Sequence, residues 1–325
     1  MPLIRRGNCA LEYLAAGNKT LADGSPAPVI TFIHGAGGNA MTWWGTTSSF
    51  VAMTKMGQVT PESGQKEYYT ICISMRGWGQ SRIDAEDPIE FMKAEHFVPD
   101  LLAVLDAEGV QETALVCHSY GGFVGVLSAY TVPERVTALV MVSTKFGLKF
   151  ADEAEEQMRS DFEREAAESR CMFPNFDAKG CLEQIRSRLS DERLRALPSI
   201  DPKERVMSYK KWFGTHVMNL RFQIGQMNHQ LNEMGLLSDP AKLRIMTDPV
   251  EELGVDAPTF RARFSGKVHF MVPLDDAAVP WEFCALMAER LGGSFEEFDP
   301  GMGDHSIMFF SPDECNKRIR AALES

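Results

Sequence analysis

The feature that most constrains this chain of 325 residues is an apolar run that ends abruptly at a serine. Residues Ala114 to Cys117 are apolar, which predicts a short strand buried within a sheet. Ser119 is followed by one residue and two glycines, and the run from Phe123 to Tyr130 is rich in apolar and small residues. That run predicts a buried helix, so Ser119 is expected at the tip of a sharp strand-to-helix turn.

A serine at such a turn is held in a strained backbone conformation, so the residues two before and two after it must be small. Gly121 meets this requirement fully, whereas Cys117 stands where glycine is usual and meets it only approximately. The arrangement is called a nucleophile elbow because it presents the hydroxyl at the end of the sheet. The short pattern alone is weak evidence, and its meaning depends on the surrounding chain.

Strand-like and helix-like segments alternate around this turn, which predicts an α/β fold with a mostly parallel sheet flanked by helices. Strands are expected at residues 9–15, 28–33, 68–74, 114–117, 136–143, 268–272 and 294–298. Helices are expected at residues 94–108, 123–130 and 279–291, with a closing helix capped by Ser311-Pro312 that runs to about Leu323.

The alternation stops between residues 151 and 264, where the pattern is almost entirely helical and is divided by turns at Pro, Asn and Asp. This switch predicts an all-helical unit inserted into an α/β core that is continuous in space. The expected core is residues 1–150 and 265–325, and the expected inserted unit is residues 151–264.

Charge and cysteine usage exclude several classes of protein. The net charge of −12 argues against a nucleic-acid or anionic-membrane partner. The seven cysteines form no C-x-x-C pair, which favours free thiols in a reducing compartment over disulfides or a metal site. Because no secretory signal and no run of 18 apolar residues is present, we expect a cytoplasmic protein without a membrane span. The oligomeric state is left open.

Five motifs in order along the chain resemble those of the α/β-hydrolases. The resemblance covers residues 1–150 and 265–325, and it includes the chain order serine, aspartate, histidine. The matching segments are His34-Gly35-Ala36-Gly37-Gly38, Arg76-Gly77-Trp78-Gly79-Gln80-Ser81, Cys117-His118-Ser119-Tyr120-Gly121, the turn from Pro273 to Pro280, and Gly303-Asp304-His305-Ser306 followed by Ser311-Pro312.

Three positions depart from the family pattern. Cys117 replaces the first glycine of the elbow, Pro273 replaces the glycine that opens the acid turn, and Ser74 stands where an aspartate usually precedes the arginine of the second motif.

The resemblance implies a catalytic triad of Ser119 as nucleophile, His305 as general base and Asp276 as the carboxylate that orients the base. It also implies an oxyanion hole formed by the backbone N–H groups of Ala36 and Tyr120. The reaction would run through an acyl-enzyme and would need no metal or organic cofactor.

Alternatives exist for the neighbouring residues. Asp275 adjoins Asp276 and is an alternative acid, whereas the position after residues 136–143, used by some relatives, offers Ser143, Thr144 and Lys145 and no carboxylate.

The three histidines at positions 34, 118 and 269 are expected to be structural. His34 would support the oxyanion loop, His118 would be packed facing away from Ser119, and His269 would be part of the core. Cys117 is expected to be a buried small residue.

In this family an insertion at this point forms a cap over the serine, so the inserted unit is expected to hold the determinants of specificity. Trp43 and Trp44 of the core and Trp212, Asn219 and Gln223 of the insertion are candidate substrate-pocket residues, with packing as the alternative.

The resulting hypothesis is a serine hydrolase that cleaves an ester, lactone or related acyl bond of a small, apolar molecule. One alternative keeps the triad for C–C bond cleavage, lyase or cofactor-free oxygenase chemistry, and another is a non-enzymatic receptor for a small ligand. Epoxide hydrolases and haloalkane dehalogenases share the fold but carry an aspartate at the elbow, so Ser119 argues against both.

Overall fold

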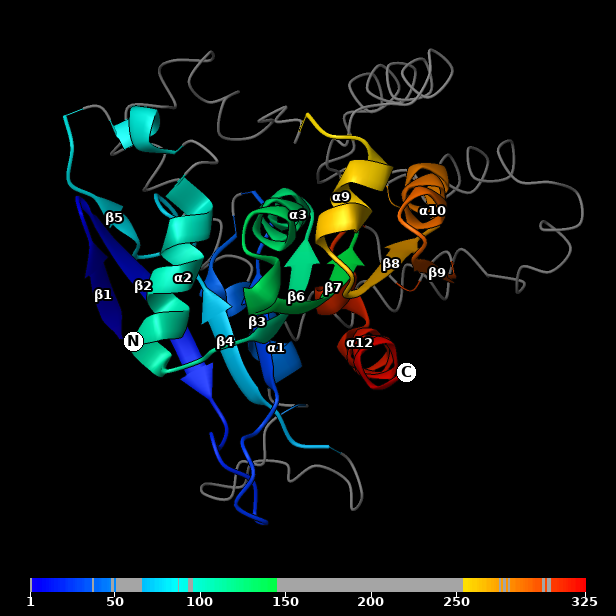
Figure 1. Ribbon diagram of the computed structural model, residues 1–325, viewed down its shortest axis with the longest axis horizontal. Helices are drawn as coiled ribbons and strands as arrows, with labels where there is room; N and C mark the ends of the chain where they lie inside the picture. The colour runs from blue at the N-terminus through cyan, green and yellow to red at the C-terminus, as the bar shows by residue number, and fades with distance from the viewer. Residues whose placement is uncertain are drawn as a thin grey trace, which may run out of the picture.

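The computed structural model describes residues 2–36, 38–47, 50, 66–86, 88–92, 96–144, 254–274, 276, 279, 281–299, 302 and 305–325. These residues form a nine-stranded sheet in the order β1-β2-β4-β3-β6-β7-β8-β9, with β5 paired to β2 (Figure 1). The strands are β1 (Leu3–Arg6), β2 (Cys9–Ala16), β3 (Val29–Ile33), β4 (Tyr69–Ile73), β5 (Arg82–Ile83), β6 (Thr113–His118), β7 (Val136–Val142), β8 (Lys267–Pro273) and β9 (Ser294–Phe298).

The six strands from β4 to β9 along this order run parallel, whereas β1 and β2 pair antiparallel at one edge. Parallel neighbours place their carboxyl ends at one edge of the sheet, where α/β proteins bind their ligands. The expected α/β fold with a mostly parallel sheet is therefore confirmed.

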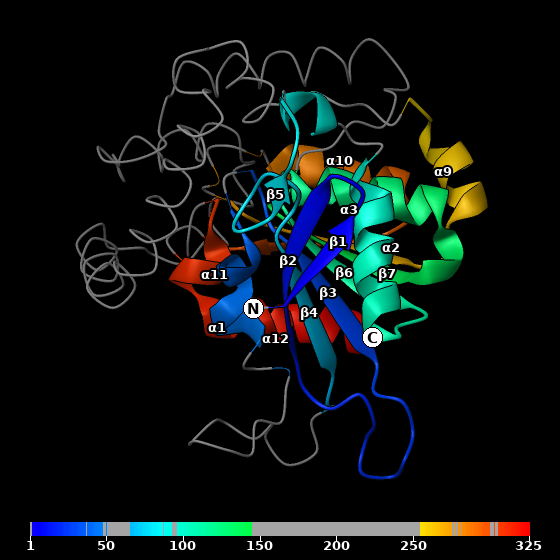
Figure 2. The same cartoon turned by 90° about the vertical axis from the view of Figure 1, so that its left-hand side faces the viewer.

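Helices cover both faces of the sheet (Figure 2). One face carries α2 (Phe97–Glu108), α3 (Gly121–Thr131), α9 (Ala257–Arg263) and α10 (Trp281–Arg290). The other face carries α1 (Trp44–Thr47), α11 (Ile307–Phe310) and α12 (Pro312–Glu324). Three short 3₁₀ helices complete the described elements: η1 (Ala40–Trp43), η2 (Pro88–Phe91) and η4 (Pro133–Arg135).

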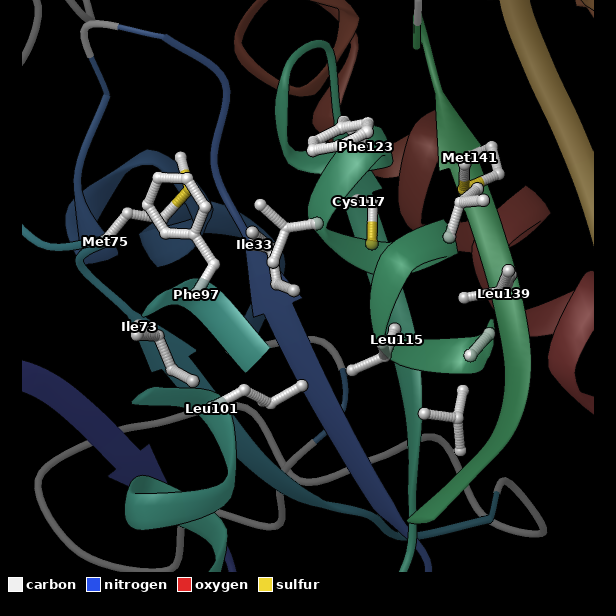
Figure 3. Packing of buried hydrophobic residues seen from close by; sticks show 14 of the residues in the cluster. Ile33, Ile73, Met75, Phe97, Leu101, Leu115, Cys117, Phe123, Leu139 and Met141 are labelled. Carbon is white, nitrogen blue, oxygen red and sulfur yellow. The ribbon is translucent and has the colours of Figure 1, made fainter. Parts of the chain in front are cut away.

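Successive side chains along each strand point to opposite faces of the sheet, so the core is divided into two clusters, one on each face. In β6, Leu115 and Cys117 point toward α2 and α3, whereas Val116 belongs to the cluster under α11 and α12. Figure 3 shows the first cluster, in which Cys117 lies among side chains of β7 and α3, with Met141 and Phe123 close by. His118 follows Cys117 and therefore lies on the opposite face of the sheet.

Most predicted elements lie within two residues of their expected limits. The structure adds β1, which the sequence pattern missed because two of its four residues are arginines and its partner is supplied by β2. Helix α10 begins at Trp281 and not at Val279. Helix α2 begins at Phe97, three residues after the expected start.

Pro312 opens the last helix as expected, and Ser311 before it is the N-cap residue. The hydroxyl makes no cap hydrogen bond and instead donates to the carbonyl oxygen of Met302. This contact anchors the loop that carries His305 to the start of α12.

The inserted unit falls largely outside the described residues. The exception is α9, which the predicted limits counted with the insertion. It packs against the core: Phe260 is fully buried and its ring stacks on Tyr130 of α3 at 6.4 Å between centroids. The division into a core and a cap of residues 151–264 stays a prediction. Among the described helices, none is long and apolar enough to cross a membrane.

Candidate active site

Ser119 lies at the carboxyl end of β6, directly before α3. Its φ of 50° is in the left-handed region that residues with a side chain seldom adopt. Its backbone N–H donates to the carbonyl oxygen of Val142 at 3.1 Å, and the N–H of Gly122 donates back to the Ser119 carbonyl at 2.9 Å. These bonds hold the turn in its strained form, with Ser119 half-buried at the edge of the sheet.

The small residues around the serine are required by close packing. A β-carbon added to Gly121 would lie 2.6 Å from the carbonyl oxygen of His34, so the elbow fits against β3 only with glycine there. Cys117 is tolerated in place of the usual glycine because Gly125 faces it from α3. A β-carbon on Gly125 would lie 2.6 Å from the Cys117 sulfur. Gly125 therefore provides the space that a glycine at position 117 would otherwise leave.

The structure brings Ser119, His305 and Asp276 into one chain of hydrogen bonds. The Ser119 Oγ lies 2.8 Å from His305 Nε2. His305 Nδ1 lies 3.1 Å and 3.0 Å from the two carboxylate oxygens of Asp276. Because a carboxylate only accepts, Nδ1–H donates to Asp276, which leaves Nε2 free to accept the serine proton. Three segments far apart in the sequence thus meet at the carboxyl edge of the sheet.

The aspartate of this chain is deeply buried. The Asp276 side chain is 0% exposed, whereas that of His305 is 21% exposed. The backbone N–H of Val279 donates to Asp276 Oδ1 at 2.9 Å, and the Asp276 N–H donates to the carbonyl of Pro273 at 3.1 Å. The turn after β8 therefore fixes the carboxylate, and the His305 ring remains partly exposed to solvent.

The loop after β3 packs directly on the elbow. A β-carbon on Gly35 would lie 2.8 Å from the β-carbon of Ser119, and Ala36 beside it is exposed. His34 braces this loop, as expected, through Nδ1 to the Gly35 carbonyl at 2.6 Å and through Nε2, which accepts from the Met75 N–H at 2.9 Å. Burial lowers the pKa of His34 to about 4, so the ring stays neutral.

Sequence reasoning missed a buried carboxylate at the neighbouring turn. Ser74 stands where the family usually has an aspartate, and its hydroxyl donates to Glu12 Oε2 at 2.7 Å from the adjacent strand β2. The same oxygen accepts from the Gln80 N–H at 2.9 Å. A carboxylate is thus present at this turn, but it comes from another strand. The only sequence signal was a single acidic residue within the apolar run of β2.

His118 was expected to pack facing away from Ser119. Its ring is buried on the face of the sheet opposite to Cys117. There it contacts the backbone carbonyl of His305, which the sequence pattern did not indicate. His269 Nδ1 lies 2.7 Å from the Ser294 hydroxyl, and its Nε2 lies 3.7 Å from the Glu296 carboxylate.

The pocket candidates are only partly described. Trp43 is 0% exposed and packs on Phe32, so the structure favours the packing alternative for this residue. The side chain of Trp44 and the residues Trp212, Asn219, Gln223, Asp275 and Asp304 lie outside the described part of the chain. In the described residues, no three His, Cys, Asp or Glu side chains gather as a metal site would require.

Comparison with known proteins places this chain in a family. The model of the family described as "Alpha/beta hydrolase family" matches residues 32–318. Epoxide hydrolase 2 of Siraitia grosvenorii is 27% identical over 150 residues, which cover 45% of this chain and 43% of that protein. A putative carbamate hydrolase of Escherichia coli O9:H4 is 28% identical over 117 residues, or 36% of this chain and 38% of that protein.

Among solved structures, the enol-lactonase from Burkholderia xenovorans LB400 matches over 100% of both chains with a TM-score of 0.60 and 15% identity. At that identity the likeness is one of fold. The sequence matches span less than half the length of both curated relatives.

Proposed function

This chain belongs to the alpha/beta hydrolase family, and we propose that it is a serine hydrolase with Ser119, His305 and Asp276 as its catalytic triad. The observation that carries the proposal is the 2.8 Å contact between Ser119 Oγ and His305 Nε2, with Asp276 on the other ring nitrogen. The three residues have the geometry and the order of roles that nucleophilic catalysis by serine requires.

In the proposed mechanism, His305 takes the Ser119 proton as the oxygen attacks the acyl carbon, and later returns a proton to the leaving group. Asp276 holds His305 in the tautomer with the proton on Nδ1 and stabilises the imidazolium that forms. Water then hydrolyses the acyl-enzyme by the same base. The half-buried Ser119 and the partly exposed His305 are consistent with access by a substrate.

The developing oxyanion needs preorganised donors, and we assign these to the backbone N–H groups of Ala36 and Tyr120. The support is the close packing of Gly35 on Ser119, which brings the residue after it to the elbow. Loss of one such donor typically costs about 3–4 kcal/mol of transition-state stabilisation.

We propose as substrate an ester, lactone or related acyl bond of a small, apolar molecule. Residues 151–264 would form a helical cap whose Trp212, Asn219 and Gln223 face the substrate, an assignment that rests on the sequence alone. The reduced, buried cysteines among the described residues agree with the cytoplasmic location expected from composition.

Epoxide opening is a poorer assignment, although one relative is named an epoxide hydrolase. A carboxylate that opens an epoxide forms an ester, which water can cleave. The Ser119 hydroxyl would instead form an ether, which a histidine base and water cannot hydrolyse, so turnover would stop after one event.

A fluorophosphonate probe tests the proposal, because it labels only an activated serine. We expect the purified chain to be labelled and Ser119→Ala and His305→Ala to be unlabelled, with p-nitrophenyl esters of graded chain length defining the acyl pocket. Absence of labelling in the wild-type chain, or labelling that persists in Ser119→Ala, would contradict the triad. Activity on the native substrate that survives Ser119→Ala but not His305→Ala would indicate chemistry without an acyl-enzyme.

A further inference from the structure

His118 is the last residue of β6 and the immediate neighbour of Ser119 in the chain. Because side chains alternate along a strand, its ring points to the face of the sheet that carries α11 and α12, opposite to Cys117. The loop that bears His305 lies between β9 and α11 and reaches the elbow from this same face. His118 as a whole residue is only 7% exposed.

The His118 ring contacts His305 in two ways. Its Nε2 lies 2.7 Å from the backbone carbonyl oxygen of His305, to which Nε2–H donates. The two imidazole rings are also in contact, tilted by 44° to each other with 4.8 Å between their centroids. One contact restrains the main chain of His305 and the other restrains its side chain.

The other sides of the His118 ring are also occupied. Trp43 lies against it edge-on, with 6.3 Å between the ring centroids. Gly35 of the oxyanion loop approaches so closely that a β-carbon there would lie 2.9 Å from His118 Nδ1. The ring therefore fills the space between the oxyanion loop and the loop of His305, at the base of the elbow.

The hydrogen bond to the carbonyl requires that Nε2 carry the proton. Burial, and secondarily the neighbouring His305, lower the pKa of His118 to about 3, so the ring is neutral at ordinary pH. A neutral His118 keeps the same donor in place while His305 gains and loses its proton.

We propose that His118 is a positioning residue. It holds the backbone carbonyl and the imidazole of His305 in place, so that the imidazole stays within hydrogen-bond distance of the Ser119 hydroxyl. The inference rests on the proposed triad. Since His118 ends β6 and Ser119 follows it directly in the chain, a shift of the strand end moves both residues together. The 2.8 Å contact between Ser119 and His305 is thereby maintained.

Two substitutions distinguish a positioning role of His118 from a role in packing alone. His118→Phe keeps an aromatic ring but removes the donor, whereas His118→Gln carries an amide N–H near the position of Nε2. We expect His118→Phe to lower kcat on p-nitrophenyl butyrate by about tenfold to a hundredfold with KM little changed, since small misplacement of a catalytic group has effects of this order. We expect His118→Gln to regain most of that loss.

His269→Gln is the matched control, because His269 is a largely buried histidine with a hydrogen bond to Ser294 at the start of β9. It should lower the melting temperature and leave kcat unchanged. The inference is overturned if His118→Phe has the kcat of the wild type. It is also overturned if both His118 variants lose kcat equally, in step with their loss of thermal stability.

Failure of the triad proposal is seen separately, in Ser119→Ala. If that variant is inactive and unlabelled by fluorophosphonate while His118→Phe turns over normally, only the positioning role is wrong. If Ser119→Ala keeps its activity, the triad itself is wrong.

Discussion

Asp276 at the carboxyl edge of the sheet and Glu108 at the end of α2 are both carboxylates that accept hydrogen bonds from ring-bearing side chains. Asp276 accepts from the imidazole of His305. Glu108 accepts from the phenol groups of Tyr13 at 2.6 Å and Tyr69 at 2.5 Å, and pairs with Lys19 at 2.8 Å. Tyr69 is the first residue of β4, so this second cluster lies toward the amino ends of the parallel strands.

The two clusters differ in what their donors can do. The phenols keep their protons, since burial and the hydrogen bond to Glu108 raise the pKa of Tyr13 to about 12. Burial raises the pKa of Glu108, but the hydrogen bonds from Lys19, Tyr13 and Tyr69 outweigh it and lower the pKa to about 2. His305, in contrast, is joined through its second nitrogen to a serine hydroxyl that it can deprotonate.

Backbone strain, like the proton that can be transferred, is found at the carboxyl edge of the sheet and not at the Glu108 cluster. Within the described residues, the non-glycine residues with positive φ are Ser119 and Ser143, at the carboxyl ends of β6 and β7. Strain of this kind costs about 1–3 kcal/mol per residue and persists where the surrounding structure enforces it. The carboxyl edge of the sheet therefore stores strain next to a serine hydroxyl whose proton His305 can take, whereas the Glu108 cluster ties α2 to β2 and β4.

Asp276→Asn should have the largest effect, because it removes the carboxylate that accepts from His305. The amide cannot select the Nδ1–H tautomer of His305 or stabilise its cation, so we expect kcat to fall by about 10⁴-fold, or about 5.5 kcal/mol. Steady-state kinetics on a p-nitrophenyl ester measures this, with Glu108→Gln as the matched acid-to-amide control. Equal kcat in Asp276→Asn and Glu108→Gln would show that the carboxylate at the site has no catalytic role.

Gly125→Ala tests the close packing of α3 on Cys117 at the elbow. The new methyl would meet the Cys117 sulfur at 2.6 Å, and we expect a net destabilisation of about 1–2 kcal/mol after the helix propensity gained by alanine. Urea unfolding of the single variants and of Cys117→Ala/Gly125→Ala measures the coupling. The double variant should be more stable than Gly125→Ala, and simple addition of the two single effects would refute the contact.

Glu108→Gln should lower the free energy of unfolding at neutral pH by about 1–2 kcal/mol, because charge-assisted hydrogen bonds are lost. The folded-state pKa of Glu108 lies below its unfolded value of about 4.3, so its stabilisation is complete above that value and is lost as the pH falls toward 2. Urea unfolding at pH 7 and pH 3 should therefore show a smaller difference between wild type and variant at the lower pH. A difference independent of pH would contradict the assignment.

Lys19→Met should have the smallest effect. The Lys19 side chain is 52% exposed, and exposed ion pairs contribute about 0–1 kcal/mol, so the two phenols should keep Glu108 in place. Thermal unfolding at low and high salt measures the change. A loss as large as that of Glu108→Gln would show that the lysine, and not the tyrosines, dominates the cluster.

The predictable part of this protein was the part encoded by local geometry. A buried strand, a serine and two glycines specify a strained turn over only a few residues, and the alternation of apolar runs specifies the sheet. The approximate fit of Cys117 was correctly noted, but its solution was not predicted. Gly125 appears in the sequence simply as one small residue among several in a helix.

The sequence pattern predicted the α/β fold and the sharp turn at Ser119, because buried strands and helices leave a periodic signal. Asp276 and His305 as partners of Ser119 followed from the resemblance to the α/β-hydrolases, which left Asp275 open. It is the structure that brings Asp276 within hydrogen-bond distance of His305. Only the tertiary structure decided that His118 contacts His305 across 187 residues, and that Glu12 reaches Ser74 across 62. Such contacts depend on which loop and which strand pack side by side. Hydrogen bonds between distant segments leave no periodic pattern in the sequence, whereas the burial of strands and helices does.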